Sequence, residues 1–338
     1  MGRITRRSWL GHLGLATAGL SPLGGLLGCS EPVQANKEET DALLALSPSG
    51  AVPDVIRIGI TPSTGQDTGA RLQPLVDYLG RSLGVRAEGV TAKDYDHLAV
   101  LVHEQQVEVG IFSPLSFVKA RQKKSKKDER FEAVAIATAT HNGSPTYLGY
   151  LVANRAKHGG RLPMLEEFRG KRIAWVNKSS TSGYLYPRAM LHERGLDPDV
   201  FFGEQLFAKN HMDALRMVRD GEVEIAAAAS SFVDPDAVPL ADDAAKQLGE
   251  SEGHSEFLVV AKTRHIPFDC VVVHERLKQE LGVSLREAFE ALVHDPVANK
   301  RLGQTWGLDG FVRPMNAGYD EVARVYADAQ KRAAKKAG

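Results

Sequence analysis

The sequence predicts an α/β fold in two lobes, each built on a parallel-type mixed sheet, and three observations support this. From Asp54 onward, apolar segments of strand length alternate with segments of helical periodicity, which is typical of βαβ units. The roughly 285 residues in this part are more than a single hydrophobic core usually holds. Two short segments, near Tyr147 and near Asp269, divide the alternating elements into sets. We therefore expect the chain to cross between the lobes twice.

The predicted elements follow one another along the chain. The first lobe should begin with strands at 55–60 and 107–112 and helices at 70–83 and 114–123. The second lobe should hold strands at 147–153, 172–176, 224–229 and 256–261, with helices at 183–195 and 211–220. The expected boundaries are 54–148 for the first part of lobe 1, 149–264 for lobe 2, and 265–338 for the return to lobe 1 and the C-terminal helices.

The N-terminal segment has the pattern of an export signal. Arginines at positions 3, 6 and 7 precede an apolar stretch at 9–27 that ends in Leu26-Leu27-Gly28-Cys29. This is typical of a signal peptide at 1–28, here similar to the twin-arginine type. Small residues before a cysteine resemble the bacterial lipobox, so we expect Cys29 to be lipidated and 29–53 to form a tether. An ordinary signal peptide with a chance cysteine is the alternative.

Charge and cysteine content limit the partners. Three of the 42 basic residues and none of the 42 acidic residues lie within 1–28, so the mature chain has a formal charge of −3. This argues against nucleic acid as a partner. Only Cys270 remains as a free thiol if Cys29 carries lipid, so no intramolecular disulfide is expected. We expect an exported monomer that is held at the cell envelope by its lipid anchor.

The segment from Arg172 to Pro187 suggests an anion site. It is predicted to run from a strand through a loop to the start of a helix, with Ser180, Thr181 and Ser182 followed by glycine. Backbone N–H groups, hydroxyl donors and the helix dipole at such a position suit a tetrahedral oxyanion. The alternative is that Ser180 only caps a helix.

Catalytic motifs are lacking in the sequence. It contains no His-Glu-x-x-His, no Gly-x-Ser-x-Gly and no Walker loop, and the histidines have no spacing typical of metal ligands. A hydrolase would need Ser180 or Thr181 as nucleophile with His211 as base. We therefore expect neither an enzyme nor a metal or other cofactor.

Several segments together resemble the phosphate, phosphite and phosphonate-binding family of ABC transporter solute-binding proteins. The resemblance covers about 55–312 and rests on the Ser-Thr-Ser-Gly loop and on matched segments at 94–95, 107–116, 143–147, 165–173, 211–224 and 266–269. It implies a type II periplasmic-binding-protein fold and capture of a small phosphorus oxyanion for an ABC permease and its ATPase. A receptor that reports occupancy to a signalling partner is the alternative.

The resemblance also implies roles for single residues. Ser180, Thr181, Ser182 and His211 would hold the oxyanion, Tyr95 and Asp269 would face its substituent, and Phe112 and Ser113 would line the other side of the cleft. Phe112 stands where relatives have a tyrosine, and Ser231 stands where they have a second carboxylate. We therefore expect phosphate, phosphite or a small alkylphosphonate to bind more tightly than aminoethylphosphonate. Packing, capping or turn roles are the structural alternatives for these residues.

Overall fold

A computed structural model describes residues 53–61, 68–122, 133–233 and 256–337. Cys29, the predicted signal peptide and nearly all of the predicted tether lie outside the described residues. In the described part of the chain, no helix combines the length and the apolar character that crossing a membrane requires.

The first sheet has six strands and mixed direction. Its order is β13 (Gly310–Val312), β4 (Ala133–Thr140), β12 (Cys270–His274), β3 (Val109–Phe112), β1 (Val55–Ile60) and β2 (Arg86–Thr91). β1 pairs in parallel with β2 and β3, whereas β12 is antiparallel to β3 and β4. β13 is also antiparallel to β4, so the two strands that come last in the sequence run against the others, which makes the sheet mixed as predicted.

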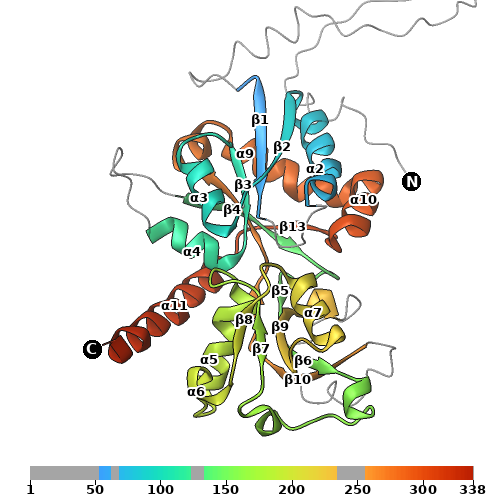
Figure 1. Cartoon of the computed structure of the whole chain (residues 1–338). Coiled ribbons are helices and arrows are strands. Elements are labelled where there is room, and N and C mark those ends of the chain that lie inside the picture. The colour runs from blue at the N-terminus through green and yellow to red at the C-terminus, as the bar shows by residue number, and fades with distance from the viewer. Residues whose placement is uncertain (1–52, 62–67, 123–132, 234–255, 338) are drawn as a thin grey trace, which may run out of the picture. The chain divides into compact units, whose positions relative to one another are not determined.

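Helices cover both faces of this sheet (Figure 1). One face packs against α2 (Thr68–Leu83), α9 (Glu275–Ala291), η5 (Leu292–His294) and α10 (Pro296–Trp306). The other face packs against α3 (Tyr95–His103), α4 (Pro114–Gln122) and the first part of α11 (Asn316–Ala337). Because apolar cores lie on both faces, central strands such as β3 are buried along their whole length and read as continuous apolar runs.

The second sheet has five strands in the order β10 (Phe257–Lys262), β6 (Gly149–Asn154), β9 (Ile225–Ala229), β7 (Ile173–Trp175) and β8 (Gln205–Phe207). One face packs against α7 (His211–Asp220) and α8 (Ser230–Val233). The other face packs against η3 (Leu165–Phe168), α5 (Tyr186–Glu193) and α6 (Pro198–Phe201). β7 is parallel to β8 and β9, and β6 is antiparallel to β9 and β10.

Two short strands pair where the chain passes between the sheets. β5 (Thr146–Tyr147) is antiparallel to β11 (Ile266–Pro267), and the rings of Tyr147 and Phe268 lie 4.7 Å apart. The two predicted crossings therefore lie side by side, in agreement with the predicted two-lobe α/β fold. The exact lobe boundaries given above stay a prediction.

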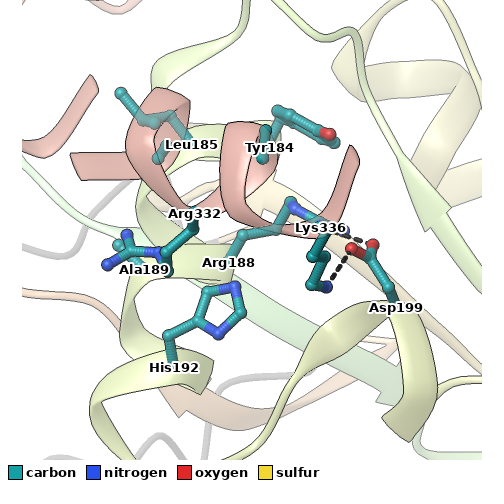
Figure 2. Close-up of a pocket in the computed structure, with 10 residues that line it drawn as sticks. Tyr184, Leu185, Arg188, Ala189, His192, Asp199, Arg332 and Lys336 are labelled. Atoms are coloured by element: carbon teal, nitrogen blue, oxygen red, sulfur yellow. Dashed lines mark hydrogen bonds and ion pairs between the residues drawn. The ribbon is translucent and has the colours of Figure 1, made fainter. Parts of the chain in front are cut away.

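The C-terminal helix α11 provides a further connection. It packs on α4 and then reaches α5 and α6 (Figure 1). Figure 2 shows the pocket at this contact, with Arg188 and Lys336 directed at Asp199. The Lys336 Nζ lies 2.6 Å from the Asp199 carboxylate, and the Arg188 guanidinium lies 2.5 Å from it. Such partly exposed ion pairs typically contribute about 0–1 kcal/mol each, so they position the helix end more than they stabilise the fold.

Candidate ligand-binding site

A second pocket lies between the two sheets and is formed by segments far apart in the sequence. The ends of β1 and β3 and the loop after α10 contribute from the first lobe, and the loop after β7, the start of α7 and the start of α8 contribute from the second. The lining residues are Ile60, Tyr95, Ile111, Ser113, Tyr147, Ser180, Thr181, Ser182, His211, Ala229, Ser231, Phe232, Phe268, Asp269, Trp306 and Leu308.

The serine-threonine loop begins a helix in an unexpected way. The first turn, η4 (Thr181–Leu185), is π-helical, and α5 follows it from Tyr186. Pro187 has no N–H to donate to the Gly183 carbonyl, and that carbonyl instead accepts the Val176 N–H at 3.0 Å. The helix predicted at 183–195 therefore starts with a turn whose hydrogen bonds join residues i and i+5, because proline lacks the N–H that an α-helical first turn would need here.

The three hydroxyl residues of this loop are nearly fully buried, with exposed fractions of 1–2%. The Ser180 Oγ accepts the Gly183 N–H at 3.0 Å, and the Thr181 Oγ1 accepts the Leu115 N–H at 2.9 Å. A hydroxyl that accepts a bond still has its own hydrogen to donate. Ser180 and Thr181 can therefore donate O–H bonds to an anion while both of these bonds remain.

His211 is a buried neutral donor. It opens α7 after the cap residue Asn210, and its Nδ1 accepts the Ala229 N–H at 3.2 Å. The hydrogen of the neutral ring therefore lies on Nε2. The ring stacks on Phe232 with 4.9 Å between centroids. Burial lowers the pKa of His211 to about 4, so the ring carries no charge at neutral pH.

Asp269 and two tyrosines supply the remaining polar groups. Burial raises the pKa of Asp269 to about 7, because an apolar environment disfavours the charged form. Burial and the nearby Asp269 raise the pKa of both Tyr95 and Tyr147, so both remain protonated donors. The buried Tyr95 hydroxyl makes no hydrogen bond within the described part of the chain. An oxyanion in the pocket would give it an acceptor.

The charge of the pocket is unusual for an anion site. No lysine or arginine is among its lining residues, and its one carboxylate is Asp269. An anion would therefore be held by neutral O–H and N–H donors in a buried setting, where such bonds are strong. Among the described residues, no group of histidine, cysteine and acidic side chains is arranged to hold a metal ion.

The structure brings together all the predicted site residues except Phe112. Phe112 is fully buried in the core between β3, α3 and α4, on the opposite side of the strand from the pocket. Its neighbours Ile111 and Ser113 line the pocket instead, because successive strand residues point to opposite faces. Phe112 therefore does not line this pocket in the structure, and its predicted role at the ligand stays a prediction.

Sequence reasoning also missed several lining residues. Tyr147 and Phe268 lay within segments that were matched to the family but were assigned to the crossings. Phe232 directly follows the predicted Ser231 and supports His211 from the pocket side. Trp306 is the last residue of α10 and Leu308 lies in the loop after it, and no local pattern distinguishes them from ordinary core residues.

The two lobes, the paired crossings and the pocket between the sheets define a ligand-binding protein of the two-lobe class. Similar solved structures support this fold. PhnD1 from Prochlorococcus marinus, in complex with methylphosphonate, matches with a TM-score of 0.66 and 16% identity over 83% of this chain and 100% of that one. A binding protein component of an ABC phosphonate transporter from Pseudomonas aeruginosa matches with a TM-score of 0.65 and 18% identity, covering 82% and 86%.

Sequence comparison identifies the family. Residues 58–319 match the model of the periplasmic substrate-binding proteins of phosphonate ABC transporters, and the chain belongs to this family. The phosphate-import protein PhnD of Mycolicibacterium smegmatis is 26% identical over 197 residues, which span 56% of this chain and 60% of that relative. The predicted family is confirmed, and it is a family of substrate-binding transport proteins and not of enzymes.

Proposed function

We propose that this protein captures a small phosphorus oxyanion in the pocket between its lobes and delivers it to an ABC permease and its ATPase. The observation that carries the proposal is the set of buried neutral donors around one carboxyl group. Ser180, Thr181, Ser182 and the His211 Nε2 surround the oxyanion, and Tyr95 donates its unpartnered hydroxyl. Family membership supports the transport role.

Asp269 favours phosphorus over sulfur as the central atom. An ionised carboxylate next to an oxyanion is repelled unless one proton lies between them. Phosphate, phosphite and phosphonates still carry an exchangeable proton near neutral pH, whereas sulfonates do not. Since the pKa of Asp269 is about 7, either the carboxyl or a phosphorus ligand can supply the proton that lies between them. With a sulfonate, only Asp269 could supply this proton.

The rest of the pocket favours a small uncharged substituent. Phe232, Phe268, Trp306 and Leu308 supply apolar surface, and the position of Ser231 carries no carboxylate. An ammonium group on the substituent would have Asp269 as its one acidic neighbour among the lining residues. A buried cation with so little compensation is unfavourable.

We therefore expect phosphate, phosphite or methylphosphonate to bind more tightly than aminoethylphosphonate, by at least about tenfold, or 1.4 kcal/mol. Isothermal titration calorimetry of the purified protein at pH 7 measures this directly. Methanesulfonate is the matched control, because it has the shape of methylphosphonate without the exchangeable proton. Preference for the amino compound, or equal binding of the sulfonate, would contradict the proposed ligand class.

We also propose that the protein is exported and anchored through a lipid on Cys29. Replacing Cys29 with alanine should release the protein from the membrane fraction, because each buried methylene of an acyl chain contributes about 0.8 kcal/mol to anchoring. Fractionation of cells followed by immunoblotting measures the distribution, and Cys270→Ala serves as a control for loss of a thiol. If the Cys29 variant partitions like the wild type, another feature anchors the chain.

A further inference from the structure

Three side chains outside the pocket connect the two lobes next to the loop at 180–182. Lys119 on α4 and Asp96 on α3 form an ion pair of 2.6 Å within the first lobe. Ser179, which directly precedes the loop in the second lobe, completes the cluster. Its Oγ accepts from the Lys119 Nζ at 2.6 Å and donates to the Asp96 Oδ1 at 3.1 Å.

Ser179 is the buried member of this cluster, with an exposed fraction of 3%. One turn of α4 earlier, the Leu115 N–H donates to the Thr181 Oγ1. Helix α4 therefore contacts two residues of the second lobe, Ser179 through Lys119 and Thr181 through the Leu115 N–H. The Ser180 between them accepts a bond from Gly183 within its own lobe. The loop is attached to the opposite lobe at two points.

We propose that Lys119 and Asp96 are positioning residues that bind Ser179 when the cleft closes and thereby set how long the ligand stays bound. This inference rests on the proposed function. The Lys119–Asp96 pair lies wholly within the first lobe, so it does not depend on contact with the second lobe. Closure adds the two bonds to Ser179, which are charge-assisted and so stronger than neutral ones.

The cluster should affect how readily the cleft opens and not which ligand the pocket prefers. None of its three members lines the pocket, so each contributes equally whichever oxyanion is bound. A contact that forms only in the closed state slows opening and release, whereas association occurs through the open state. Loss of the cluster should therefore raise the dissociation rate of every ligand by the same factor.

The test compares Lys119→Met with Arg121→Met. Arg121 lies on the same helix and pairs with Asp320 in the first lobe, so the control removes the same charge without touching Ser179. Stopped-flow measurements with inorganic phosphate and with methylphosphonate should show dissociation about tenfold faster in Lys119→Met. Association should change less than about twofold, and Arg121→Met should match the wild type in both rates.

Two further variants sharpen the test. Ser179→Ala should speed dissociation at least as much as Lys119→Met, because it removes the bonds to both Lys119 and Asp96. The double variant should be no worse than Ser179→Ala alone, since the bond to Lys119 is already lost in that variant. Lys119→Arg should retain most of the slow dissociation. Unchanged dissociation, a different factor for each ligand, or a change confined to association would overturn the proposal. If the wild type binds neither ligand, the proposed function itself fails and the inference falls with it.

Discussion

Gly183→Ala is expected to weaken oxyanion binding by at least about 100-fold and to destabilise the protein by about 1–3 kcal/mol. A Cβ on Gly183 would lie 2.5 Å from the Val176 Cβ and 2.9 Å from the Ser180 Oγ. Val176 cannot give way easily, because its N–H donates to the Gly183 carbonyl and its own carbonyl accepts from Lys209. The loop must therefore move, and the donors of Ser180 and its neighbours move with it.

Calorimetric titration with inorganic phosphate and thermal unfolding together measure both effects. Gly303→Ala is the matched control: Gly303 lies in α10, where the nearest atom to an added Cβ is 3.6 Å away. That variant should bind like the wild type and be as stable or slightly more so, since alanine favours a helix over glycine by about 1 kcal/mol. Wild-type affinity in Gly183→Ala would show that the loop is not the anion cradle.

Elements with strong local signals could be predicted closely from the sequence. The strand predicted at 55–60 coincides with β1, since a short apolar run is what a central strand requires. The helix predicted at 211–220 coincides with α7. Asn210 caps its start, and Gly221, which has a left-handed backbone conformation, ends it. The edge strand β2 (Arg86–Thr91) was missed because its residues are only partly buried, so they do not form the apolar run that marks a central strand.

The site could be predicted less completely, for a different reason. The loop at 180–182 carries its own signal, because hydroxyl residues before glycine are unusual except at a turn or helix start. The resemblance gave the position of Phe112 in the chain but not the face of the strand on which it lies, so its burial in the core could not be predicted. Trp306 was missed because its contribution depends on how α10 packs, and tertiary packing leaves no mark in a window of a few residues. The π-helical turn depends on Pro187 together with the bond from the Val176 N–H to the Gly183 carbonyl, and the second of these is a tertiary contact that the local sequence does not show.

Two buried titratable groups of the pocket, His211 and Asp269, have opposite effects on stability. The pKa of His211 is lowered from 6.5 to about 4, so its contribution is lost as pH falls through this range, because only the unfolded chain takes up a proton. The pKa of Asp269 is raised from 3.8 to about 7, so unfolding releases a proton between these values. Raising the pH there favours unfolding. The two effects offset one another in the wild type between about pH 4 and 6.5.

Comparing Asp269→Asn with the wild type should isolate the effect of the Asp269 carboxyl. The variant should resemble the wild type in stability near pH 4, because the amide mimics the protonated carboxyl. It should then become the more stable of the two as pH rises, by up to about 4 kcal/mol at pH 7. Above pH 7 the carboxyl is ionised in both the folded and the unfolded wild type, so the difference should stay constant.

Urea denaturation at intervals from pH 4 to 8 measures this difference, and His211 cancels from it because both proteins contain that residue. Asp77→Asn is the control, since Asp77 lies on the exposed side of α2; its difference from the wild type should stay within about 0.5 kcal/mol across the range. A constant difference for Asp269→Asn would mean that the carboxyl is already ionised in the folded protein at pH 4. In that case no proton would be available to share with a ligand, and the preference for phosphorus over sulfur would need another cause.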